Sequence, residues 1–172
     1  MAGSLVVLTG ASGSGKTTLA RAVQQSRTEC EVLFFDSVGV PSAEVMATFG
    51  SGHQPGGAWQ RAMTMQWIER IATTLRSGRR VVFEGQMRIA FIQEALAAQE
   101  ICDARVILVD CPDAIRKARL VDDRKSPHLA SKDMLSWAAY LRQEAVSAGC
   151  EILDTGITPI EEAVRRITSY LS

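Results

Sequence analysis

The chain has 172 residues, of which 47% are hydrophobic and 22% are charged, and its formal net charge is zero. This composition argues against a disordered chain, and the length is typical of one domain, which we predict over residues 1–172. The zero net charge argues against a nucleic-acid partner, since no overall field attracts a polyanion.

A glycine-rich segment near the start of the chain fits the pattern G-x-x-x-x-G-K-[ST]. The apolar run 5–9 before it predicts a strand, and a helix is predicted after it, from about Lys16 to Arg27. A strand–loop–helix unit with this pattern binds nucleotide phosphates. The predicted nucleotide-binding residues are Gly10, Ala11, Ser12, Gly13, Ser14, Gly15, Lys16, Thr17 and Thr18.

Each residue type in this segment has a physical reason to be there. Glycines let the backbone approach a phosphate closely, so that the N–H groups of the loop and the start of the helix converge on the anion. Lys16 supplies a mobile positive charge for the outer phosphates, and Thr17 offers a hydroxyl group to Mg²⁺. The predicted cofactors are therefore ATP and Mg²⁺.

Beyond this unit, strands and helices alternate along the chain. The further predicted strands are 31–36, 81–84, 105–110 and 151–154, and the predicted helices are a short one after Ser42, then about 58–76, 89–99, 113–120, 131–148 and 159–171. A glycine-rich break at 50–57 contains His53, which we expect to be a solvated loop residue. The alternation predicts a parallel sheet covered on both faces, with ligands beyond the carboxyl ends of its strands.

Acidic residues end several predicted strands on the edge that carries the glycine-rich loop. Asp36 is the preferred general base or acceptor ligand, although it could be a turn residue after its strand. Glu84 is the alternative base, or a group that holds a Mg²⁺-bound water, and it could instead fix a loop. We expect Asp110 to be structural, because a proline and a helix start follow it.

Basic residues gather between 116 and 125. Guanidinium groups suit phosphate oxygens, so we predict that Arg119 and Arg124 contact the transferring phosphoryl group, with Arg116 behind them. A solvated helix end with local ion pairs is the alternative. The break at 126–128 would allow residues 119–131 to act as a closing lid.

The segment of about 37–77 is predicted to form the acceptor side of the site. An acceptor pocket could be lined by Trp59, Met63, Met65 and Trp67, although a stripe of such residues at helical spacing is more often core; Trp59 is of most interest because it follows the glycine-rich break. Arg88 and Gln86 could reach the acceptor, or they could be plain surface residues.

The cysteines and the start of the chain bear on location. Cys30, Cys102, Cys111 and Cys150 form no C-x-x-C pair, so we expect buried free thiols rather than disulfides or a zinc site. The first residues lack the basic segment of a signal peptide, and the first apolar run is too short to span a membrane. We therefore expect a cytoplasmic protein without a membrane partner.

With these residues in view, the chain resembles the P-loop nucleoside-monophosphate-kinase-like group, which includes adenylate kinase, shikimate kinase, gluconate kinase and chloramphenicol phosphotransferase. The match rests on residues 10–18, on Asp36, on 84–88 and on the helix 115–120 with Arg124 after it. The resemblance implies an α/β protein with the three-layer α/β/α P-loop NTPase fold, five parallel strands in the order 2-3-1-4-5 and a short lid. It also implies that residues 153–155 lie against the adenine. Glu84 stands where nucleotide kinases of the group have Asp.

These features together predict ATP- and Mg²⁺-dependent phosphoryl transfer to a small-molecule acceptor, such as a nucleoside, a nucleotide, a sugar acid or a similar hydroxyl compound, by a monomer or homodimer. One alternative is a regulatory P-loop NTPase with a protein partner, but the chain has no N-K-x-D and no apolar run ending in two acids after the third strand. The other is a polynucleotide 5′-kinase, which should carry a basic strand-binding groove.

Overall fold

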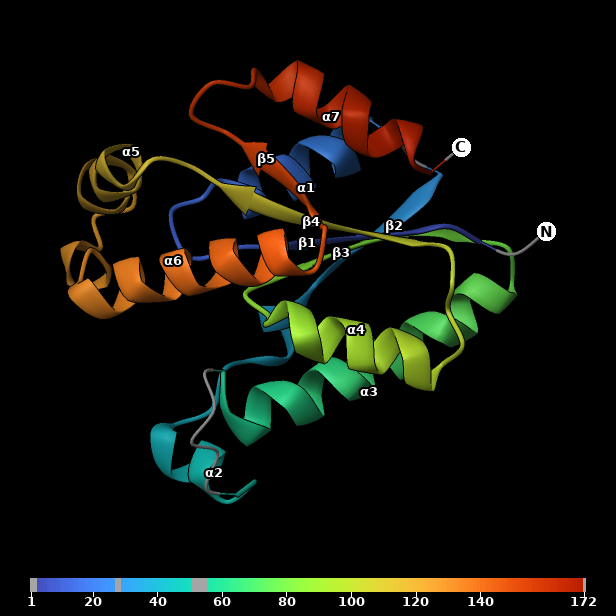
Figure 1. Cartoon of the computed structure of the whole chain (residues 1–172). Helices are drawn as coiled ribbons and strands as arrows, with labels where there is room; N and C mark the ends of the chain where they lie inside the picture. Colours follow the sequence, from blue (N-terminus) through green and yellow to red (C-terminus); the bar gives the residue numbers. More distant parts are fainter. Residues whose placement is uncertain (1–2, 27–28, 51–55, 172) are drawn as a thin grey trace.

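The computed structural model describes residues 3–26, 29–50 and 56–171, and Figure 1 traces the whole chain. The elements are β1 (Leu5–Thr9), α1 (Lys16–Ser26), β2 (Cys30–Phe34), α2 (Ala43–Ala47), α3 (Gly57–Arg76), β3 (Arg80–Gly85), α4 (Ile89–Ala98), β4 (Ala104–Asp110), α5 (Asp113–Ala118), α6 (Lys132–Ser147), β5 (Glu151–Asp154) and α7 (Ile160–Ser169). Short 3₁₀ turns cover Phe35–Val38 and Pro127–Leu129, and a π-helical turn covers Arg119–Asp123. His53 and most of the predicted glycine-rich break lie outside the described residues.

The strands form a five-stranded sheet in the order β2-β3-β1-β4-β5, and every neighbouring pair is parallel. The predicted order is confirmed. The chain leaves β1 toward β2 and β3 on one side and returns to β4 and β5 on the other, so β1 lies at the switch point of the sheet. Ligands of such sheets bind beyond the carboxyl ends of the strands at this point.

The three layers follow from the alternation of side chains along buried strands. Leu5 and Val7 of β1 belong to the core beneath α3 and α4, whereas Val6 and Leu8 belong to the opposite core beneath α1 and α7. Figure 1 shows α1 and α7 on one face of the sheet and α3, α4 and α6 on the other. The predicted three-layer α/β/α fold is therefore confirmed.

The strand β2 is shorter than predicted. It ends at Phe34, and Asp36 lies in the 3₁₀ turn that follows. The reason is Phe35, which is only 3% exposed and packs so closely on Gly85 that a Cβ there would lie 2.4 Å from the Phe35 Cβ. Turning Phe35 into the core bends the chain before Asp36.

The predicted cap of α2 is confirmed, because the Ser42 hydroxyl accepts a hydrogen bond from the Val45 N–H.

All four cysteines are free, as predicted. Cys30 and Cys111 are buried and Cys150 is half-buried, but the expectation of burial is wrong for Cys102, which is exposed in the turn between α4 and β4. In the described part of the chain, no helix is both long and apolar enough to cross a membrane.

Candidate active site

The loop between β1 and α1 takes a shape that glycine makes possible. Gly13 and Gly15 have φ angles of 78° and 92°, in the left-handed region that other residues avoid. The loop is also closely covered, because a Cβ at Gly13 would lie 3.0 Å from Leu120 and 3.1 Å from Arg116. The segment after β4 therefore lies directly against the predicted phosphate-binding loop.

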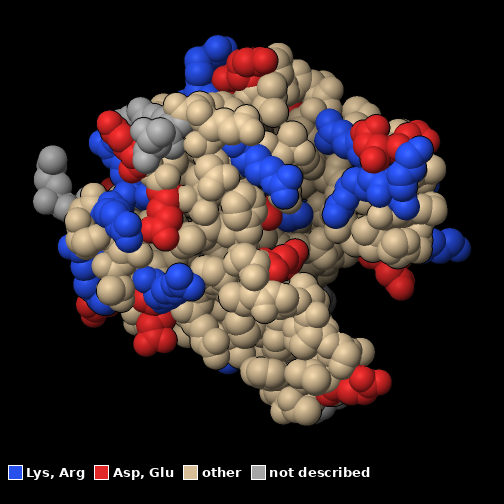
Figure 2. All heavy atoms as spheres, turned by 180° about the vertical axis from the view of Figure 1, so that it is seen from behind, with Lys and Arg blue, Asp and Glu red and all other residues tan. Residues whose placement is uncertain are grey.

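A cavity of about 560 Å³ opens beside this loop, within the size range of small-molecule sites. Its walls come from the loop and α1, from the π-helical turn and from the segment between β5 and α7, including Gly13, Gly15, Lys16, Thr17, Thr18, Arg119, Asp123, Arg124, Thr155, Thr158, Ile160 and Ala163. Figure 2 shows that one face of the molecule is hollowed and that Lys and Arg side chains gather on it. Residues far apart in sequence thus share one site.

A carboxylate and a hydroxyl group meet beside Lys16. The Thr17 Oγ1 lies 3.2 Å from Oε1 and 3.3 Å from Oε2 of Glu84, which is the last residue but one of β3 and is 4% exposed. Burial raises the pKa of Glu84, although the charge of Lys16 and the hydrogen bond from Thr17 act in the opposite direction. Burial lowers the pKa of Lys16, against the attraction of Glu84 and Asp36. The structure therefore brings all four predicted residues into one electrostatic cluster.

The Thr17–Glu84 pair fits Mg²⁺ by its donor chemistry, since both groups offer oxygen atoms. Among the described residues, no group of three or more His, Cys, Asp or Glu side chains could hold a metal. Mg²⁺ usually takes one or two protein ligands and completes its shell with phosphate oxygens and water. The residues present thus suit a metal that arrives with a nucleotide.

Asp36 differs from Glu84 in its surroundings. It lies in the turn after β2, it is exposed, and its charge acts on both Lys16 and Glu84. It therefore stands near the loop with access to solvent. Its roles as a base and as an acceptor ligand stay predictions.

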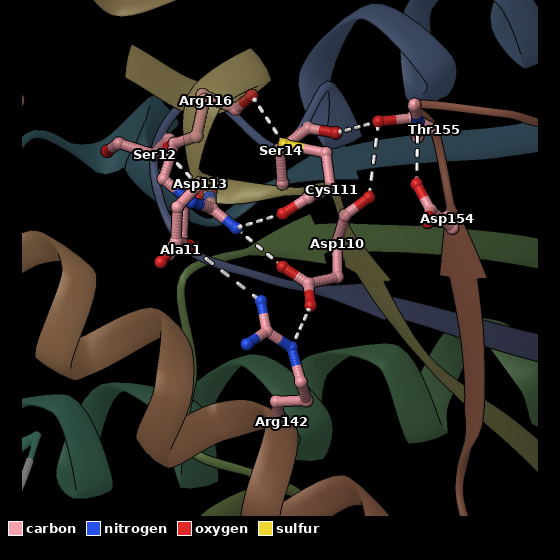
Figure 3. Close-up of polar contacts among 12 residues, drawn as sticks. Ala11, Ser12, Ser14, Asp110, Cys111, Asp113, Arg116, Arg142, Asp154 and Thr155 are labelled. Atoms are coloured by element: carbon pink, nitrogen blue, oxygen red, sulfur yellow. Dashed lines mark hydrogen bonds and ion pairs between the residues drawn. The ribbon is translucent and has the colours of Figure 1, made fainter.

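Arg116 supports the loop from behind, as Figure 3 shows. Its side chain is fully buried, and its guanidinium donates to the carbonyls of Ser12 (2.8 Å) and Ala11 (3.4 Å) and to Asp110 Oδ1 (2.5 Å). Asp110 Oδ2 also accepts from Arg142 Nε of α6 at 2.6 Å. The interpretation of Asp110 as structural agrees with these contacts. The contribution of Arg142 was not predicted, because it lies in a separate helix and carries no motif.

Arg119 and Arg124 both line the cavity, but their contacts differ. Arg119 Nη1 donates to Thr155 Oγ1 at 2.8 Å and to the Ser14 carbonyl at 3.3 Å, and its Nη2 donates to the Thr155 carbonyl at 3.0 Å. Arg124 is exposed. Arg119 thus joins the loop to the segment after β5, whereas Arg124 is accessible to a ligand. Their predicted contacts to a phosphoryl group stay predictions.

Two predicted acceptor-binding residues have partners within the protein. Arg88 Nε lies 2.8 Å from Glu144 Oε1, and its guanidinium covers the ring of Tyr140. Trp59 contacts Phe35 edge-on, with ring centroids 5.8 Å apart. Glu144 has no sequence signal, since a single acid on a long helix is common. The predicted roles of Arg88 and Trp59 toward an acceptor stay predictions.

Gln60 links α3 to the loop after β3. Its Nε2 donates to the Gln86 carbonyl at 2.9 Å, and its Oε1 accepts from the Arg88 N–H at 2.9 Å. The Gln86 side chain in turn accepts from the Ser12 hydroxyl at 3.1 Å. A continuous chain of hydrogen bonds therefore runs from the acceptor-side helix to the phosphate-binding loop, and no sequence pattern predicted Gln60 as its link.

Solved structures share this fold. A sugar kinase from Janibacter sp. is 20% identical, with a TM-score of 0.67 over 99% of this chain and 95% of that chain. An APS kinase from Mycobacterium tuberculosis, in complex with AMPPNP and APS, is 16% identical, with a TM-score of 0.62 over 99% and 98%. A shikimate kinase from Acinetobacter baumannii, in complex with shikimate, is 17% identical, with a TM-score of 0.59 over 98% and 92%. Among curated proteins, no sequence matches the chain significantly.

A protein-family comparison matches residues 6–137, which is more than half of the chain, to a family described as AAA domain. The matched region holds the glycine-rich loop, Asp36, Glu84, Arg119 and Arg124. The order of the sheet and the solved structures agree with a P-loop fold of the kind found in small-molecule kinases. The chain therefore belongs to the AAA domain family and has the fold of the small P-loop kinases.

Proposed function

We propose that this protein is a P-loop kinase that transfers the γ-phosphoryl group of ATP to a hydroxyl group of a small molecule. The observation that carries the proposal is the cluster of Lys16, Thr17 and Glu84 beside a cavity of about 560 Å³. A cation for the phosphates and oxygen ligands for a metal lie together at the switch point of the sheet. The kinases among the similar structures support this proposal by their shared fold.

Each residue of the site then has a role. The N–H groups of the loop and Lys16 hold the phosphates, and Thr17 and Glu84 hold Mg²⁺, which neutralises phosphate charge when it is bound. Arg124 contacts the phosphoryl group, while Arg119 holds the loop in place. Asp36 accepts the proton of the attacking hydroxyl group as its oxygen bonds to phosphorus and the bond to ADP breaks. Because Glu84 already contacts Thr17, we assign it to the metal rather than to the base.

The remaining walls of the cavity suit the nucleoside. Thr155 and Thr158 offer hydroxyl groups, and Ile160 and Ala163 offer apolar surface on which a base can lie. We propose ATP as the nucleotide that binds here.

We further propose that residues 1–172 act as one kinase domain, with the acceptor side at about 37–77 and a lid at about 119–131. We also propose that the protein is a cytoplasmic monomer or homodimer. The free thiols fit a reducing compartment.

A screen for acceptor-dependent ADP release tests this function. The purified protein is incubated with Mg²⁺, ATP and a panel of nucleosides, nucleotides, sugars and other hydroxyl compounds, and phosphorus NMR identifies any phosphorylated product. We expect at least one acceptor to stimulate ADP release and to gain a phosphoryl group. Lys16→Ala should lose turnover while circular dichroism shows an intact fold.

Other outcomes would contradict the proposal. ATP hydrolysis that no acceptor stimulates, or that only a protein partner stimulates, would favour a regulatory NTPase. Salt-sensitive binding of single-stranded DNA with transfer to its 5′ end would favour a polynucleotide kinase. Full turnover by Lys16→Ala would refute the assignment of the phosphate-binding loop.

A further inference from the structure

The acceptor side of the site has an uneven charge. The sequence from 28 to 60 contains no Lys or Arg, although it contains the acids Glu29, Glu31, Asp36 and Glu44. This stretch begins before β2 and ends inside α3, so it includes the turn with Asp36 and the whole of α2. The basic residues that line the cavity beside the phosphate-binding loop are Lys16, Arg21, Arg119 and Arg124, and they lie on the nucleotide side.

Two arginines that follow this stretch, Arg61 on α3 and Arg88 before α4, are held by acids. Arg61 forms an ion pair with Glu94 on the neighbouring helix α4. Arg88 forms an ion pair with Glu144 at 2.8 Å, and its side chain is only 19% exposed. Because Glu144 Oε2 also accepts from the N–H of Ile89 at 2.7 Å, the pair is fixed at the start of α4. Neither arginine is therefore placed to receive an anionic acceptor without losing its partner.

The same stretch exposes apolar surface. The exposed fractions are 56% for Val38, 58% for Val40, 48% for Val45 and 45% for Phe49. None of the residues of α2 is buried. Figure 1 shows that α2 projects from the body of the protein, and Figure 2 shows a projecting lobe with few charged side chains. A group of exposed apolar residues next to a candidate site indicates a ligand-binding surface.

The charge and the polarity of this surface together restrict the chemical class of acceptor that can bind. A phosphate or carboxylate group on the acceptor would lie near Asp36 and Glu84, and anions are normally bound by guanidinium or ammonium groups, of which the described residues 29–50 and 56–60 have none. An uncharged acceptor meets no such repulsion, and an apolar body would cover the exposed valines.

We infer that the acceptor is an alcohol without phosphate or carboxylate groups, and that its apolar body contacts Val38, Val40, Val45 and Phe49. The inference rests on the proposed kinase function. It excludes the nucleotides and the sugar acids from the predicted acceptors. The transfer itself is unchanged, because the alcohol oxygen bonds to the γ-phosphorus, the bond to ADP breaks and the proton passes to Asp36.

Matched pairs of acceptors test the inference. Each pair keeps the same free hydroxyl group and body but differs in one anionic group, such as 3′-O-methylthymidine with thymidine 3′-monophosphate, or 3-phenyllactamide with 3-phenyllactate. We expect the best acceptor to be uncharged and its kcat/KM to exceed that of its anionic partner by at least about tenfold. An anionic acceptor that equals or exceeds its neutral partner would overturn the inference and leave the proposed function standing. A panel in which no compound accepts a phosphoryl group would overturn both.

A pair of variants locates the contact. Val40→Asp places a charge on the proposed surface, and Val146→Asp places one on α6, where Val146 is 68% exposed. For the best neutral acceptor, Val40→Asp should raise KM by about tenfold while the KM for ATP stays the same. Val146→Asp should change neither. An unchanged acceptor KM in Val40→Asp, with native circular dichroism, would show that the acceptor does not use this surface.

Discussion

The two carboxylates near the phosphate-binding loop, Glu84 and Asp36, have the same chemistry but different surroundings, and these surroundings suit them to different roles. Glu84 is buried at the end of β3 and accepts from Thr17, whereas Asp36 is exposed in a turn. A buried carboxylate with a hydroxyl partner suits a fixed metal ligand, and a solvated one can exchange a proton with an acceptor and then with water. Unlike surroundings therefore separate the two roles.

The role of Asp36 leads to a test on phosphoryl transfer. Asp36→Asn keeps the size of the side chain but removes the base, so kcat should fall by roughly 10²–10⁴-fold while ATP affinity changes little. Glu44→Gln, which removes an exposed acid from α2, should leave kcat unchanged. An effect of Asp36→Asn below about tenfold would move the base to Glu84.

The pKa of Glu84 predicts how stability depends on pH. Burial raises this pKa above its ordinary value of 4.5, so the folded protein holds the proton to higher pH than the unfolded chain does. Stability that depends on Glu84 should therefore fall as pH rises through the interval between the two pKa values, and then level off. Relative to Glu84→Gln, the wild type should lose free energy of unfolding across this interval in denaturant titrations.

Glu94 supplies a control of opposite sign. Its hydrogen bond with Arg61 lowers the pKa of Glu94, so the wild type should gain stability relative to Glu94→Gln as pH rises through the acid range. If the difference between wild type and Glu84→Gln were flat with pH, the burial of a charged Glu84 would not be what shifts its pKa.

At the scale of elements, α5 and the π-helical turn form a support for the phosphate-binding loop. Arg116 and Arg119 come from this one segment, and both donate to carbonyls of the loop. These arginine contacts use the carbonyls of the loop and none of its N–H groups, of which that of Ser14 donates to the Ala11 carbonyl at 3.2 Å. N–H groups that converge in such a loop bind anions. Leu120 is fully buried in the same segment, so the first two residues of the proposed lid 119–131 should stay fixed and any lid motion should begin after them.

Removal of Arg116 should damage both stability and nucleotide binding. Arg116→Met leaves Asp110 with only Arg142 as an ion-pair partner and removes the arginine donor from the carbonyls of Ser12 and Ala11, of which Ala11 keeps the N–H of Ser14. Breaking a buried ion pair by removing one partner typically costs about 3–5 kcal/mol of unfolding free energy, and ATP affinity should fall with it. Arg142→Met removes the more exposed partner and should cost less in the same denaturant titration. Equal costs would show that the buried arginine has no special role.

The elements also show where sequence reasoning succeeds. The glycine-rich loop, the strands around it and the order of the sheet were predictable, because they depend on a local motif, on apolar periodicity and on a family resemblance. The turn at Asp36 was not predictable, since it depends on Phe35 meeting Gly85 across two strands. Likewise, the partners of Arg88 and Arg116 lie on α6 and β4, and only the tertiary fold brings them together.

At the scale of the whole molecule, the cavity is a property of the folded chain alone. Its walls join the loop after β1, the turn after α5 and the segment before α7. An unfolded chain cannot gather these residues, so a ligand that binds here must stabilise the native state.

Mg²⁺-ATP at 100 times its dissociation constant should therefore raise the free energy of unfolding by about 2.7 kcal/mol. Denaturant titrations with and without nucleotide measure this change. At the same nucleotide concentration, Lys16→Ala should show little stabilisation, because it lacks the cation for the outer phosphates. Equal stabilisation of both proteins would place nucleotide binding elsewhere.

The amide of Gln60 has a consequence for how the two substrates affect each other. If a bound acceptor displaces α3, the hydrogen bond of Gln60 transmits the displacement to Gln86, and the hydrogen bond of Gln86 transmits it to Ser12 in the phosphate-binding loop. The coupling between the two substrates would then depend on the Gln60 side chain. Because such coupling is reciprocal, ATP must raise the affinity for the acceptor by the same factor by which the acceptor raises the affinity for ATP.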